Sequence, residues 1–340
     1  MEQYARKLTE NAVKKQTKSC GETLTMILKS IHISLVFIIL LIWTPSLSEA
    51  GSIEPVKKSR LIILPLQPEK TTEFDGTGLG VHFLLGNMIA VHTGLKEFWF
   101  GWRITKIFRG KNQLHAYCRG NEPLPDIARL GEEQQIRYWL EGTYKRKQGM
   151  IFLALNLFDT LNPDQKNMIQ IPLDTRDHLI GFRKLFLAWL EKCGLPISKE
   201  QAEKAMWPEK ITPEGLDFLG RALEKTYHGY FEPKLDENHT ESLIWFDKAL
   251  AQCPESYLIH DMKGWAFYKN KDYTKALTSF QTAVELNKNG LGALSGMMYC
   301  YIYLGNQTKA IKFAQAKADV RNASKEKITK FVIKKMNSLK

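Results

Sequence analysis

Three closely spaced glycines, Gly76, Gly78 and Gly80 in the stretch "FDGTGLG", are the first residues whose type and spacing could do chemistry. Glycines at a helix start let backbone N–H groups approach an anion, so a phosphate-binding loop is the chemistry to test. The spacing is G-x-G-x-G rather than the dinucleotide pattern G-x-G-x-x-G, and no G-K-[ST] follows. We therefore predict a tight helix entry and no nucleotide or other cofactor.

Metal and nucleophile sites are not expected either. His82 and His92 share one predicted helix but lie about three turns apart, too far to hold one ion. "GALSGM" lacks the G-x-S-x-G nucleophile elbow, and no Ser, His and Asp set is recognisable by spacing. The four cysteines that follow residue 50 are far apart without a C-x-x-C pair, so zinc is not expected. Buried free thiols are favoured there over one or two disulfides: Cys118, Cys193, Cys253 and Cys300. The sequence predicts a protein that is not an enzyme.

The elements between Lys57 and about Gly194 mix strands and helices. "RLIILPL" is an apolar run typical of a buried strand, and "GLGVHFLLGNMIAVHTGL" has apolar residues on a helical period. "FWFGWRITKIF" is rich in strand-forming residues, and "IRYWLEGTYKRKQGMIFLALNLFDT" predicts two strands joined by a turn at Lys145–Gly149. "LIGFRKLFLAWLEKCG" predicts an amphipathic helix ending at Gly194.

This order of elements resembles the amino-terminal α/β domain of TolB and its relatives. The family has an apolar strand ending in Pro and an aromatic, a D-G opening the first helix, and an "LEGS"-like strand. Here "LPL" at Leu64–Leu66, Asp75 with Gly76, and "LEGT" at Leu140–Thr143 occupy those places, with Leu66 in place of the aromatic. The resemblance implies an α/β domain with a mixed sheet over residues 57–195.

The clearest pattern is a repeat of 34 residues in the C-terminal half. Tyr257–Gly290 resembles a tetratricopeptide repeat, with Gly264, Phe280 and Ala283 at signature positions, and Leu291–Ser324 follows as a degenerate copy. An earlier copy over residues 212–256 carries about ten extra residues in "YHGYFEPKLDEN". Residues 325–340 would then cap an all-α helical solenoid with Ile328, Val332 and Met336 on the buried face. Prolines in residues 196–211 predict a linker between two separately stable domains.

A repeat solenoid offers a concave groove for a protein or peptide partner. In tetratricopeptide proteins the groove side chains lie at the second, fifth, ninth, twelfth and thirteenth positions of each repeat, which here include Asp217, Glu224, Lys225, Asp261 and Ser295. The Lys and Asn clamp of chaperone-tail binders is absent. Aromatic groove residues could instead pack against neighbouring helices or the α/β domain. The residues on which the groove prediction rests are Arg221, Trp265, Tyr268, Lys269, Tyr299 and Tyr303.

An apolar run, Ile31–Trp43, is shorter than the roughly 20 residues that a membrane-spanning helix needs. Lys29 precedes it, and small residues Ser48 and Ala50 follow, so residues 26–50 have the parts of a secretory signal cleaved after Ala50. The leading residues 1–25 lengthen this signal or result from a start codon placed too far upstream. If residues 1–43 are retained, they would instead be a membrane anchor.

The net charge of +12 could favour nucleic acid, anionic lipid or an acidic partner, but the lysines are spread over all segments. With export expected, nucleic acid is not predicted as a partner. These observations predict a non-catalytic adaptor of the bacterial periplasm or cell envelope, whose groove binds protein partners with acidic and aromatic segments. The alternative is a sensor or regulatory subunit anchored in the inner membrane that signals through its repeats.

Overall fold

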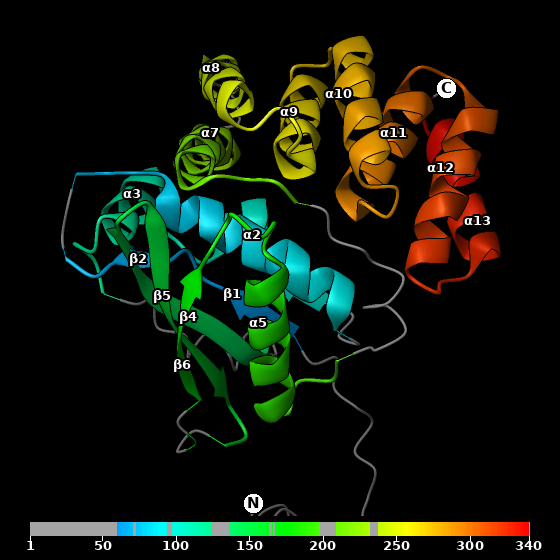
Figure 1. Cartoon of the computed structure of the whole chain (residues 1–340). Coiled ribbons are helices and arrows are strands. Elements are labelled where there is room, and N and C mark those ends of the chain that lie inside the picture. The colour runs from blue at the N-terminus through cyan, green and yellow to red at the C-terminus, as the bar shows by residue number, and fades with distance from the viewer. Residues whose placement is uncertain are drawn as a thin grey trace, which may run out of the picture. The chain divides into compact units, whose positions relative to one another are not determined.

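The computed structural model describes residues 60–70, 73–93, 97–123, 136–162, 165, 167–197, 209–231 and 237–339. The predicted signal, residues 1–50, and most of the predicted linker, residues 196–211, lie outside these ranges. All described residues belong to one compact unit, Lys57–Lys340. Figure 1 shows a mixed sheet with helices followed by a run of packed helices, which confirms the predicted fold class.

The sheet has the strand order β3-β1-β4-β5-β6, and a short β2 also pairs with β4. β1 is parallel to both β3 and β4, whereas β4, β5 and β6 form an antiparallel meander. The predicted tight turn is confirmed, because Gln148 and Gly149 between β4 and β5 both have positive φ, at 53° and 73°. The strands are β1 Arg60–Ile63, β2 Gln67–Pro68, β3 Glu97–Trp99, β4 Ile136–Lys147, β5 Met150–Asp159 and β6 Met168–Leu173.

The strand expected over "FWFGWRITKIF" is mostly wrong. β3 ends at Trp99, and Gly101–Lys106 forms a 3₁₀ helix, η1. Gly101 has a φ of +60°, a left-handed conformation that glycine adopts readily because it has no Cβ. The extended strand ends before this residue. The sequence pattern also missed β6 and α3, Lys111–Cys118.

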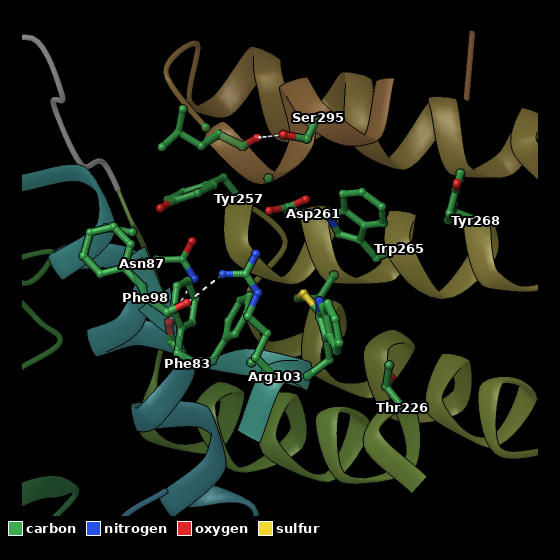
Figure 2. A pocket seen from close by; sticks show the side chains of 18 of the residues that line it. Phe83, Asn87, Phe98, Arg103, Thr226, Tyr257, Asp261, Trp265, Tyr268 and Ser295 are labelled. Atoms are coloured by element: carbon green, nitrogen blue, oxygen red, sulfur yellow. Dashed lines mark hydrogen bonds between the residues drawn. The ribbon is translucent and has the colours of Figure 1, made fainter. Parts of the chain in front are cut away.

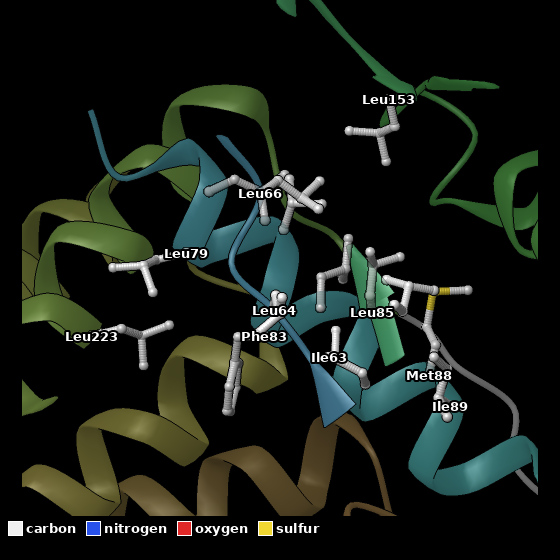
Figure 3. Packing of buried hydrophobic residues seen from close by; sticks show 14 of the residues in the cluster. Ile63, Leu64, Leu66, Leu79, Phe83, Leu85, Met88, Ile89, Leu153 and Leu223 are labelled. Atoms are coloured by element: carbon white, nitrogen blue, oxygen red, sulfur yellow. The ribbon is translucent and has the colours of Figure 1, made fainter. Parts of the chain in front are cut away.

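Helix α2, Thr77–His92, is buried on nearly all sides, as expected for a helix without a polar face. It lies between the sheet and α7, Pro213–Phe231 (Figure 1). Figure 3 shows Leu79 pointing toward Leu223 of α7, with Leu85 and Met88 on another side of α2. One apolar core therefore extends from β1 through α2 into the helical region.

The glycines of "FDGTGLG" allow α2 to approach its neighbours at backbone distance. A Cβ on Gly76 would lie 2.0 Å from the carbonyl oxygen of Asp217, and a Cβ on Gly220 would lie 1.7 Å from that of Gly76. Gly78 meets the Leu66 carbonyl in the same way, at 2.0 Å. The glycines thus serve close helix packing, in agreement with the predicted tight helix entry.

The helices that follow α7 pack as antiparallel neighbours along the chain, whereas α5, Ile180–Lys192, packs against β6 (Figure 1). Helices α9, α11 and α13 begin at Tyr257, Leu291 and Lys325, so the element recurs every 34 residues, as predicted. Val332 and Met336 of α13 are buried, as expected for a cap. The helices are α5 Ile180–Lys192, α8 Glu237–Gln252, α9 Tyr257–Lys269, α10 Tyr273–Leu286, α11 Leu291–Tyr303, α12 Gln307–Val320 and α13 Lys325–Asn337.

The ring of Phe280 fills the space between α9 and α11. A Cβ on Gly264 would meet this ring at 2.6 Å, and one on Gly296 at 2.2 Å. Phe280 itself is fully buried. Small residues at these two positions therefore fix the spacing of the helices that form the wall described next.

Candidate ligand-binding pocket

A pocket of about 790 Å³ lies where the α/β region faces the paired helices. One wall comes from α2, η1 and α7, and the other from α9, α11 and α12 (Figure 2). This volume is in the range of sites for a small molecule or a short peptide segment. Because the walls are distant in sequence, the pocket depends on how the helices fold over the α/β region.

Aromatic side chains make up much of the wall on α9 and α11. Trp265 lies edge-on to Tyr268 at 5.3 Å between ring centroids, and 6.3 Å from Tyr299. Its other side meets core Phe280 at 5.3 Å. Trp265 therefore contributes to both the core and the pocket. Ser295 of α11 also lines the pocket, and its hydroxyl donates to the Leu291 carbonyl, 2.6 Å away.

A buried histidine positions the α/β side of the pocket. The Gly101 N–H donates to Nε2 of His82 at 3.0 Å, which fixes the first residue of η1. Burial lowers the pKa of His82 to about 3, so the ring is neutral and can accept this bond. Two residues further on, Arg103 donates from Nη1 to the Phe98 carbonyl at 2.7 Å and points into the pocket (Figure 2).

Four cationic side chains line the pocket: Arg103, Lys269, Lys317 and Arg321. Within the described part of the chain, none of the four forms an ion pair. Burial lowers the pKa of Lys317, and the charges of Arg321 and then Arg103 lower it further. Lys317, near the end of α12, therefore feels the positive charges of both Arg321 and Arg103.

Asp261 of α9 is the one carboxylate among the described residues that line the pocket. It is 2% exposed and lies against Gly292 of α11. Its Oδ1 atom has no partner among the described residues. Burial raises its pKa to about 8, so the carboxyl is mostly protonated at neutral pH.

Four of the six predicted groove residues line this pocket: Trp265, Tyr268, Lys269 and Tyr299. Arg221 lies elsewhere, paired with Asp217 at 2.8 Å and placed over the Phe74 and Trp245 rings. Tyr303 is 39% exposed and stacks on Tyr273 at 5.2 Å, outside the pocket lining.

The groove positions of α7 contact the α/β region of the same chain. Asp217 accepts from the Gly76 N–H at 2.7 Å, and Glu224 contacts Nδ1 of His115 in α3 at 2.5 Å. Arg221 packs on Phe74. The first helix therefore has its groove face covered by residues 73–76 and α3, which explains why Arg221 is not in the pocket.

Three pocket cations were not predicted as site residues: Arg103, Lys317 and Arg321. Arg103 lies in the stretch predicted to be a strand, and the other two lie on the second helix of a pair, outside the groove positions of the repeat. A local signal for them was absent, because their proximity comes from the packing of η1 against the end of the helical run.

The other residues considered for chemistry lie outside the pocket. His92 is buried at the end of α2, with a pKa lowered to about 4 by burial and by Arg183. The four cysteines from Cys118 to Cys300 are buried and free. In the ranges that the structure describes, no three potential ligands gather to hold a metal ion. None of the helices described has both the length and the apolar character needed to span a membrane.

Comparison with known proteins adds no family to this description. No protein-family model matches the chain, and no curated protein matches it.

Proposed function

We propose that this chain is a non-catalytic binding protein whose pocket holds a peptide segment of a protein partner. The observation that carries the proposal is the aromatic wall formed by Trp265, Tyr268 and Tyr299 opposite η1. Tyr and Trp combine a large contact area with a polar group and dominate the energy of many interfaces. The 34-residue recurrence supports a tetratricopeptide-like groove, and the preceding sheet supports a TolB-like domain.

The chemistry of the lining supports binding over catalysis. The described lining has a single carboxylate, Asp261, and contains neither His nor Cys. The Ser295 hydroxyl is engaged with its own helix, so it is not paired with a base. A nucleophile needs an adjacent base within hydrogen-bond reach, which this lining does not supply.

The test is to select binders from a phage-displayed random peptide library and to measure their affinity for blocked variants. Ser295→Trp places an indole in the pocket and should weaken the selected peptides at least about tenfold, or about 1.4 kcal/mol. Thr278→Trp is the matched control, because its hydroxyl also donates to its own helix, 3.3 Å from the Thr274 carbonyl, and its side chain is exposed outside the pocket. Failure to select any peptide, or equal binding by Ser295→Trp, would contradict the proposal.

We also propose export to the bacterial periplasm or cell envelope, with the protein acting as an adaptor there. The support is the signal-like sequence of residues 26–50. An intact mass that begins at Gly51 is the expected result. Recovery of Met1 in a membrane fraction would favour the anchored sensor instead.

A further inference from the structure

The strongest unexplained feature is the group of three cations that face the pocket from two elements. Arg103 comes from η1, whereas Lys317 lies in the last turn of α12 and Arg321 is its C-cap residue. All three line the pocket, where Lys317 and Arg321 are half-buried and Arg103 is exposed. Like charges brought together under partial burial cost free energy unless an anion neutralises them.

Some arginines elsewhere in the described residues differ from Arg103 in having acidic partners. Elsewhere in the described residues, the arginines at the α7 junction are paired: Arg221 with Asp217 at 2.8 Å, and Arg146 with Glu214 at 3.1 Å. Arg103 instead donates to the Phe98 carbonyl and lies over the Trp102 ring, at 6.0 Å, without an acidic partner among the described residues. The α7 junction therefore has acidic partners for its arginines, whereas Asp261, the one acid in the described lining of the pocket, forms no ion pair with Arg103, Lys317 or Arg321.

We infer that Arg103, Lys317 and Arg321 form an anion-binding subsite that takes the side-chain carboxylate of an acidic residue in the bound peptide. This inference rests on the proposed function. A guanidinium fixed by a carbonyl acceptor is oriented for a charge-assisted bond with a carboxylate, and two arginines with a lysine provide the matching positive charge. The aromatic wall on α9 and α11 then takes the apolar or aromatic residues next to it.

The peptide selection described above tests this directly, because the sequences selected report what the pocket prefers. Wild-type protein should enrich peptides in which Asp or Glu adjoins an aromatic or apolar residue. The triple variant Arg103→Gln, Lys317→Gln, Arg321→Gln should lose the acidic preference and bind the wild-type peptides at least about tenfold more weakly. Its melting temperature should stay equal or rise, which separates lost binding from lost folding.

A matched control removes three positive charges outside the pocket, so that the net charge changes by the same amount. It carries Lys309→Gln, Lys312→Gln and Lys327→Gln, all at exposed positions. It should select the same peptides as wild type. Charge reversal by Lys317→Glu with Arg321→Glu should shift the selection toward basic peptides. Binding of the acidic peptides by wild type should also weaken with added salt.

Each failure has a distinct meaning. Peptides that Ser295→Trp loses but that contain no acidic residue would overturn the anion subsite and leave the proposed function standing. An acidic preference that persists in the pocket triple variant would also overturn the subsite. Stabilisation by inorganic phosphate, with preference for phosphopeptides over Asp and Glu peptides, would overturn the carboxylate assignment. Absence of any selected peptide would instead overturn the proposed function.

Discussion

Helices α7 and α9 are the first helices of two successive pairs, and their equivalent faces have different neighbours. The α/β region covers this face of α7, whereas the same face of α9 lines the pocket. Asp217 and Asp261 both lie four residues after the first residue of their helix, Pro213 or Tyr257. Asp217 accepts from the Gly76 backbone and from Arg221, whereas Oδ1 of Asp261 has no partner among the described residues. Equivalent carboxylates therefore meet different surroundings because the α/β region covers only the first helix of the run.

The contacts of α7 with the α/β region also differ in kind from those at the pocket. On α7, glycines permit backbone contact, and acids and bases neutralise one another. At the pocket, aromatic rings of α9 and α11 line the cavity together with cations of η1, α9 and the end of α12 that form no ion pair among the described residues. The junction at α7 is therefore closely packed and neutralised, whereas the other side leaves a cavity that, under the proposed function, holds the partner's peptide.

The largest expected effect comes from breaking the covered junction at its closest approach. Gly220→Ala puts a Cβ 1.7 Å from the Gly76 carbonyl oxygen, so α2 and α7 must separate. We expect a loss of about 3 kcal/mol in the free energy of unfolding, measured by urea denaturation. Gly110→Ala is the control, because nothing lies within 4 Å of its Cβ position. Equal stability of the two variants would show that the junction is not tight.

The next largest effect should come from removing the charge that neutralises Arg221. Asp217→Asn retains an acceptor for the Gly76 N–H but loses the ion pair with Arg221. We expect destabilisation by about 2 kcal/mol, because a hydrogen-bonded carboxylate is replaced beside a partly buried guanidinium. A variant as stable as wild type in the same denaturation experiment would remove the contrast between the two aspartates.

The third prediction concerns Asp261 at the pocket, whose replacement by Asn should change how the free energy of unfolding depends on pH. The pKa of Asp261 is raised by burial to about 8 in the folded protein, from its ordinary value of 3.8, so the folded state binds the proton more tightly than the unfolded state. Stability from this group is present at low pH and is lost as pH rises toward 8, by about 1 kcal/mol between pH 7 and 8.

Asp261→Asn should abolish this part of the loss, as measured by denaturant unfolding at pH 7 and 8. Glu209 adds a smaller loss over the same interval, because burial raises its pKa to about 7. Glu209→Gln is therefore the control that should retain the Asp261 contribution. An unchanged slope in Asp261→Asn would mean that this carboxyl is already ionised in the folded pocket.

The smallest effect concerns the repulsion among the pocket cations. Lys317→Gln should raise the free energy of unfolding by about 0.5 kcal/mol at low salt, because it removes a charge placed near Arg103 and Arg321. Added salt should shrink the gain. Lys312→Gln, exposed on the same helix, should change stability little. Destabilisation by Lys317→Gln would mean that the lysine has a neutralising partner.

Local patterns predicted the elements that repeat or alternate. The 34-residue period placed the starts of α9 and α11, and the alternation in β5 is visible as buried Ile151 and Leu153 between half-buried neighbours. Gly101 illustrates the limit, because an apolar stretch typical of a strand bends at one residue with positive φ into η1. The strand propensity of the flanking aromatics could not show that bend.

The site was predictable only where it follows the repeat. Trp265 and Tyr299 occupy the same repeat position, so the register placed both on one wall. Arg221 shares that position but is covered by Phe74, because the α/β region packs on α7. Arg103 and Arg321 come together through this tertiary packing, and no spacing along the chain relates them.

The distance along the chain between η1 and α12 also bears on the order of synthesis. The aromatic wall on α9 and α11 can form once these helices have emerged, but Lys317 and Arg321 follow later. A growing chain, or one shortened by proteolysis within α12, would present aromatic residues without the cations that select an acidic partner. If the pocket binds an acidic peptide as proposed, discrimination between partners becomes complete only after α12 and its C-cap residue have folded.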